Sequence, residues 1–200
     1  MTAERDSQGD AQTADEEGRR VVAATRDWLE KAVIGLGLCP FAERVYLRRQ
    51  IRYHVSQETS TSGLLRELEA ELRHLHGADP AACETTLLIH PHVLGDFADY
   101  NQFLDEADAT VRALGLEGAL QVASFHPAYR FAGTGADDIE NYSNRSPYPM
   151  LHLLREASVT RAVESFPGVG EIAARNAATL SALGHSGWRR LWLAPPLNRR

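Results

Sequence analysis

The spacing of hydrophobic and polar residues divides the first half of the chain into helices and strands. Residues 19–36, 61–77 and 96–115 each place apolar side chains on one stripe of a helix. Residues 51–55 alternate between apolar and polar side chains, as in an edge strand with one wet face. Residues 86–89 show no alternation between apolar and polar side chains, which is typical of a central strand covered on both faces. The pattern therefore predicts alternating helices and strands.

A third strand is predicted at residues 119–125, and it leads directly into His126-Pro127. From there to Pro149 neither a helical nor a strand period persists. A loop of this length is uncommon in a compact domain unless it binds or covers something. The loop is therefore a candidate part of a functional site.

The C-terminal part of the pattern favours helices. From Pro149 the chain is predicted to be helical, because Tyr148, His152 and Arg155 share a helical face at three- and four-residue spacing. A further helix is predicted from residue 172, ended by Gly184.

Taken together, these elements predict an α/β fold. Its sheet would be small and mainly parallel, with three to four strands flanked by helices, and its C-terminal part would be helical. We expect a disordered acidic tail over residues 1–18, a single globular domain over 19–187, and an arm or tail over 188–200. In a parallel sheet, ligands bind beyond the carboxyl ends of the strands.

Composition narrows the choice of partners and compartment. The net charge of -6 and the pI near 5.7 argue against nucleic acid as a partner, because its phosphates attract basic surfaces. The sequence shows neither a signal peptide nor a membrane span, so no membrane partner is expected. Its two cysteines form no disulfide framework or zinc ribbon, which favours the reducing cytoplasm.

Three histidines follow predicted strands and form the first candidate site. His90 and His92 flank Pro91 after the second strand, and His126 follows the third. Proline holds its predecessor extended, so His90 and His92 are expected to point the same way. The three imidazoles could ligate a divalent metal such as zinc, act as acid and base, or bond to the backbone, and these alternatives remain open.

Cys39 precedes Pro40, which suits the first turn of a short helix. Amides at a helix start can lower a thiol pKa and make the thiolate reactive, whereas a small buried cysteine would be inert. With His126 and His90, Cys39 completes the set of candidate catalytic residues.

The polar loop and the segment after it supply candidate ligand contacts. Asn144, Arg145 and Ser146 offer an amide, a guanidinium and a hydroxyl that suit a carboxylate or phosphate oxygen, although an arginine in a loop also clamps backbone carbonyls. The full candidate substrate-binding set is Asn144, Arg145, Ser146, Tyr148, His152 and Arg155. It suggests a small, anionic ligand.

Five blocks of sequence, in order, resemble an uncharacterised bacterial family, the domain-of-unknown-function family 1415. They are Gly37–Ala42, Thr86–Pro91, Asp96–Asn101, Gln121–Pro127, and Asn141–Pro149 with Leu151–Arg155. The likeness extends from about Arg19 to Leu183. It implies one small domain containing all five blocks, and it implies no activity.

Three classes of function fit these residues. A small-molecule hydrolase or transferase would use His126 and His90, either around a metal or as acid and base. A binder of metal or a small anion would use the same residues without catalysis. An interaction module would present the polar loop for docking, with Trp188 and Trp192 as anchors.

Overall fold

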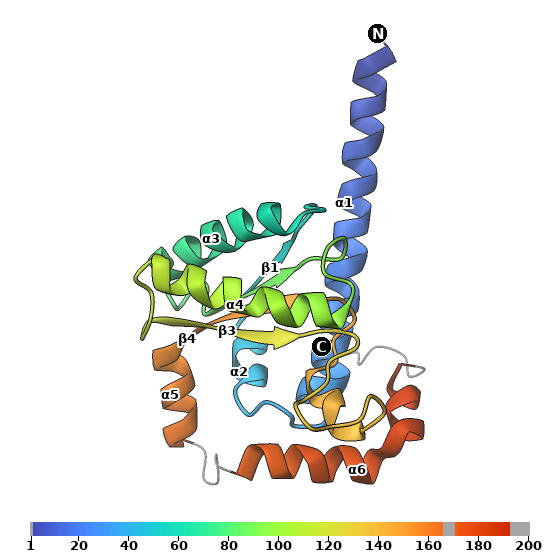
Figure 1. Ribbon diagram of the computed structural model, residues 1–200, viewed down its shortest axis with the longest axis vertical. Helices are drawn as coiled ribbons and strands as arrows, with labels where there is room; N and C mark the ends of the chain where they lie inside the picture. The colour runs from blue at the N-terminus through green and yellow to red at the C-terminus, as the bar shows by residue number, and fades with distance from the viewer. Residues whose placement is uncertain (1, 166–170, 193–200) are drawn as a thin grey trace.

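The computed structural model describes residues 2–165 and 171–192, and a four-stranded sheet lies at its centre (Figure 1). The strands are β1 (Ile51–Val55), β2 (Thr85–Ile89), β3 (Leu120–Phe125) and β4 (Met150–Arg155). Their order in the sheet is β1-β2-β4-β3. β1 runs parallel to β2, whereas β4 runs antiparallel to both of its neighbours. The α/β class is confirmed, and the sheet is mixed rather than mainly parallel.

β4 is the strand that the sequence pattern placed wrongly, as a helix. In the structure its side chains alternate: Leu151 and Leu153 pack on one face of the sheet, and Met150 packs on the other. A short apolar run fits a buried strand and a buried helix equally well by periodicity. The spacing of Tyr148, His152 and Arg155 is therefore no helical face.

The insertion of β4 leaves β2 and β3 pointing the same way, because each is antiparallel to it. Their carboxyl ends consequently meet at one edge of the sheet. His90 and His126 follow these two ends, as predicted.

Helices α3 (Thr61–Gly77) and α4 (Phe97–Ala113) cover the first face of the sheet (Figure 1). Ser60 caps α3, and Asp96 caps α4 by accepting the amides of Ala98 and Asp99. Both helices were predicted. The polar face of β1 is only partly exposed, because Arg52 makes a 2.7 Å ion pair with Glu71 of α3.

The second face is covered by the N-terminal and C-terminal helices. They are α1 (Thr2–Trp28) with its π-helical continuation η1 (Leu29–Ile34), the short α2 (Ala42–Leu47), and α6 (Ile172–Leu191). Trp28, Leu180 and Trp188 pack with β2 and β4 residues in this layer. Every residue of β2 is buried, as expected for a central strand.

The remaining elements connect the sheet to its surroundings. The 3₁₀ helix η2 (Ile139–Asn144) lies within the long loop, and α5 (Glu156–Ser165) follows β4 directly. α6 is interrupted at Gly184, whose φ of 64° and ψ of 170° are not helical. The helix predicted from residue 172 therefore ends there, and a second helical segment follows across the kink. None of the helices described is both long and apolar enough to cross a membrane.

Parts of both ends of the chain, expected as tails, lie in helices. Residues 2–18 are helical as part of α1, which projects beyond the body of the protein (Figure 1). Residues 188–191 belong to α6, and Trp188 is buried. The rest of the expected C-terminal arm, residues 193–200, lies outside the described residues.

Candidate functional site

His90 and His126 lie close together beyond the ends of β2 and β3, as the strand directions require. The ring of Tyr100 from α4 packs against both, with centroid distances of 5.8 Å to His90 and 5.0 Å to His126. Phe97 also contacts His126 at 5.4 Å. Both histidines are buried. The predicted meeting of imidazoles at one sheet edge is therefore seen.

Backbone groups fix the proton positions on these two histidines. Val93 O lies 2.9 Å from His90 Nδ1, so this nitrogen donates and Nε2 carries the lone pair. His126 Nδ1 accepts from the Ala128 amide at 3.0 Å, so its Nε2 donates to Leu94 O at 3.2 Å. Burial lowers the pKa of both, that of His90 to about 4. Both rings are therefore neutral at pH 7, and their hydrogen bonds hold the backbone of the loops that follow β2 and β3.

His92 does not join this pair. Its side chain is 32% exposed and lies 3.3 Å from Glu17 of α1, whereas His90 is fully buried. The chain turns directly after β2, so the extended geometry that would align the two side chains is lost. Within the described ranges, no group of three or more His, Cys, Asp or Glu side chains could hold a metal ion.

The polar loop is held together by its own side chains. Asn144 Nδ2 donates to Ser124 O, and Ser146 Oγ donates to Tyr148 O. Asn141 is fully buried and bonds to three loop groups: it accepts from the Phe131 amide and the Thr134 hydroxyl, and it donates to Gly135 O. Of the candidate ligand contacts, Asn144 thus ties the loop to β3, and Ser146 bonds to the backbone of Tyr148.

Arg145 acts on the same loop. Its Nε donates to Tyr129 O at 3.2 Å and its Nη2 donates to Ala136 O. The guanidinium lies 4.2 Å from the centre of the Tyr142 ring. The planar guanidinium of Arg145 therefore binds backbone carbonyls and an aromatic ring of the loop, which is the clamping role considered above as the alternative to ligand binding.

Replacing Arg145 with lysine is expected to lower the free energy of unfolding by about 1–2 kcal/mol, because an ammonium cannot reach both carbonyls and cover the ring. Urea unfolding at neutral pH measures this loss. Arg130→Lys is the matched control, since Arg130 is exposed in the same loop and should tolerate the change. Equal stabilities for both variants would contradict the clamp.

A cavity of about 70 Å³ lies against the second face of the sheet. Its walls come from β2 and β4, from the chain between η1 and α2, and from α5. Most of the wall is apolar, and it includes Trp28, Phe41, Leu87, Phe125, Leu154 and Val159. Cys39, His152 and Arg155, three of the predicted site residues, also line it. The structure therefore divides the predicted site between a sheet edge and a sheet face.

Cys39 reaches this cavity from the segment before α2. Burial raises the pKa of its thiol, although the amides of Phe41 and Ala42 oppose the rise. The thiol is therefore protonated at neutral pH. The predicted reactive thiolate is not favoured in this environment.

His152 enters the cavity wall from the middle of β4. Its Nε2 lies 2.7 Å from Thr85 Oγ1, and its ring contacts Phe125 at 6.0 Å. Burial lowers the pKa of His152 to about 4, so the ring is neutral. A neutral imidazole in an apolar wall can exchange hydrogen bonds with a bound molecule.

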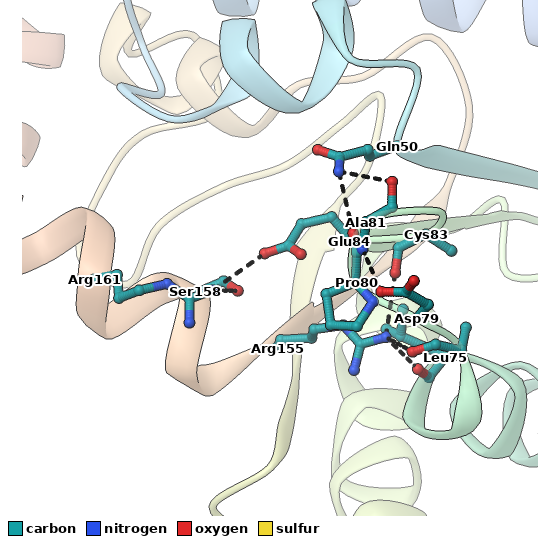
Figure 2. A network of polar contacts seen from close by, with 11 residues as sticks. Gln50, Leu75, Asp79, Pro80, Ala81, Cys83, Glu84, Arg155, Ser158 and Arg161 are labelled. Carbon is teal, nitrogen blue, oxygen red and sulfur yellow. Dashed lines mark hydrogen bonds and ion pairs between the residues drawn. The ribbon is translucent and has the colours of Figure 1, made fainter.

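Arg155 lies at the edge of the cavity, where Figure 2 shows it reaching toward the end of α3. Its Nη2 donates to the carbonyls of Leu75, Ala78 and Cys83 at 2.6–3.2 Å. Arg155 thus joins β4 to the C-terminal end of α3. Glu84 lies nearby, with Arg161 3.7 Å from its Oε1 (Figure 2).

The comparisons with known proteins place the chain in a family. A family described as protein of unknown function, DUF1415, matches residues 20–190. The chain belongs to DUF1415. No curated protein and no solved structure matches it.

The sequence blocks that carry the DUF1415 resemblance build both sites. Gly37–Ala42 and Leu151–Arg155 contribute Cys39, Phe41, His152 and Arg155 to the cavity. Thr86–Pro91, Asp96–Asn101 and Gln121–Pro127 contribute His90, Tyr100 and His126 to the sheet edge. The sequence did not identify Thr85 and Asn141 as site residues, because nothing beyond their polar residue type distinguishes them in the sequence.

Proposed function

We propose that this DUF1415 protein binds a small, largely apolar molecule in the cavity lined by Cys39, His152 and Phe125. The observation that carries this proposal is an apolar cavity with an imidazole in its wall. At about 30 Å³ for each water molecule, the enclosed volume holds roughly two waters, so a single-ring compound fits only if part of it extends into the cavity mouth or the wall moves. The net charge of -6 supports a small molecule rather than nucleic acid as the partner.

Binding is favoured over catalysis because the thiol of Cys39 and the imidazole of His152 are both neutral in the wall. Burial raises the pKa of Cys39 and lowers that of His152, which opposes the thiolate–imidazolium pair that a cysteine nucleophile uses. The neutral groups can orient a ligand without being activated.

A hydrolase or transferase is the second candidate function, because a thiol and an imidazole line the same cavity. A substrate that excludes water or brings its own charge would have to change their protonation. Replacing Cys39 with serine separates the candidates: turnover that is lost while binding persists would support the enzyme. Metal-dependent chemistry at His90, His92 and His126 has less support, because His92 lies apart from the others.

Toluene is a suitable first probe, because it matches the apolar wall and cannot hydrogen-bond. We expect toluene to raise the melting temperature and to shift the methyl NMR signals of Leu29, Val33 and Val159, which line the cavity. Val159→Phe should fill the cavity and abolish both effects while the protein remains folded by circular dichroism. A wild-type protein whose methyl signals do not respond to toluene would overturn the proposed function.

A further inference from the structure

Two polar side chains on neighbouring strands, Thr85 of β2 and His152 of β4, form a short hydrogen-bonded chain in the cavity wall. Thr85 Oγ1 lies 2.7 Å from His152 Nε2 and 2.6 Å from Leu153 O. Thr85 is 4% exposed, so water does not compete for its hydroxyl. The chain of contacts therefore runs from the imidazole through the hydroxyl to a backbone carbonyl.

Counting protons along this chain fixes the form of the imidazole. A carbonyl oxygen only accepts, so the single hydroxyl proton of Thr85 must point to Leu153 O. Thr85 Oγ1 then accepts from His152, and Nε2 carries the ring proton. If the hydroxyl proton pointed to His152 instead, Thr85 Oγ1 and Leu153 O would face each other at 2.6 Å with no proton between them. His152 Nδ1 is consequently the bare nitrogen.

Nothing in the described part of the chain hydrogen-bonds to His152 Nδ1. The one hydrogen bond of this side chain to a described residue is at Nε2, and the ring forms part of the cavity lining. An acceptor in a cavity wall stabilises a ligand that donates a hydrogen bond to it, and it disfavours a ligand that covers it without bonding. The wall therefore favours one kind of polar group.

We propose that the Thr85–His152 pair selects ligands that carry a hydrogen-bond donor, namely phenols and ring compounds with an N–H. This ligand class rests on the cavity binding proposed above. Trp28, Phe41 and Phe125 supply aromatic walls for the ring, and Nδ1 receives the donor proton. Thr85 acts as a positioning residue, because it keeps the imidazole in the accepting form.

The experiment compares phenol with toluene, which have the same ring and differ in the donor. Dissociation constants for both are measured by calorimetry on the wild type, His152→Phe, Thr85→Val and Thr86→Val. Removing the phenol hydroxyl from water costs free energy in every variant. The informative quantity is therefore the ratio of the phenol and toluene dissociation constants, compared between the wild type and each variant. His152→Phe should lower the preference for phenol by about 2- to 12-fold, the factor given by one hydrogen bond. Toluene binding should stay nearly unchanged.

The two threonine variants separate positioning from packing. Thr85→Val removes the hydroxyl that fixes the proton and should reduce the preference for phenol. Thr86 is the next residue and is also fully buried, but its hydroxyl has no partner among the described residues and it faces away from the cavity, as its neighbour Leu88 does. Thr86→Val should leave the preference unchanged.

Imidazole nitrogen NMR on the wild type gives a test that needs no variant. We expect Nδ1 of His152 to show the signal of a bare nitrogen, which shifts on adding phenol and not on adding toluene. A protonated Nδ1, or equal preference in the wild type and His152→Phe, would overturn the selection of donors. Toluene that binds normally in that case would leave the cavity binding intact, whereas failure of both probes would overturn both.

Discussion

Lowering the pH from 6.5 to 4 is expected to destabilise the protein by up to about 3 kcal/mol for each of two histidines, His90 and His152. Burial lowers the pKa of both to about 4, below the unfolded value of 6.5. Between these values the unfolded chain binds more protons than the folded one. Stability is therefore fully present above pH 6.5 and is lost as the pH falls toward 4. Urea unfolding across this range measures the loss.

Carboxylates also begin to titrate near the lower limit, so a variant is needed to assign the effect. His152→Phe keeps a flat ring in the cavity wall and removes one of the two titrating groups. It should show a clearly smaller loss of stability between pH 6.5 and 4 than the wild type. If the two proteins lose stability in parallel, His152 does not titrate as inferred.

Replacing Tyr100 with phenylalanine is expected to cost about 2–4 kcal/mol of unfolding free energy, although it removes one oxygen atom. The hydroxyl of Tyr100 donates to Met150 O at 2.9 Å and accepts from the Phe125 amide at 3.0 Å. Met150 is fully buried and Tyr100 is fully enclosed by α4 and the sheet. Losing the hydroxyl leaves two backbone groups without partners where β3 and β4 meet.

Tyr129→Phe is the matched control for this change. Tyr129 packs its ring against Phe97 and Phe131, and no hydrogen bond of its hydroxyl is among those described. Its variant should unfold at nearly the same urea concentration as the wild type. A Tyr100→Phe protein as stable as this control would show that water replaces the lost hydroxyl.

Local patterns in the sequence were enough to predict most elements of the fold. Asp96 and Ser60 lie at helix starts where their side chains bond to amides three residues or fewer away, so α3 and α4 follow from nearby residues. β2 follows from a segment without alternation that ends in three apolar residues. β4 does not, because Leu151 and Leu153 pair and pack with residues of β2 and β3 that are 27 or more residues away, and only those partners decide between strand and helix.

The candidate site shows the same division between local and distant information. That His90 and His126 meet could be predicted, since each directly follows a strand end. Their hydrogen bonds to Val93, Leu94 and Ala128 could not be predicted, because these partners are backbone groups whose positions depend on the turns. The cavity brings Cys39 beside a strand more than 100 residues later, and no spacing in the sequence records that approach.

The position of β4 between β2 and β3 also affects how the chain assembles during synthesis. β3 is complete at residue 125, but its only pairing partner in the described sheet ends at residue 155. Until that segment leaves the ribosome, β2 has one open edge and β3 has two, and the apolar side chains that will pack on β4 lack their partner. The nascent DUF1415 domain therefore passes through a stage at which β1 and β2 can pair but β3 has no partner. Aggregation or chaperone binding is most favoured at that stage.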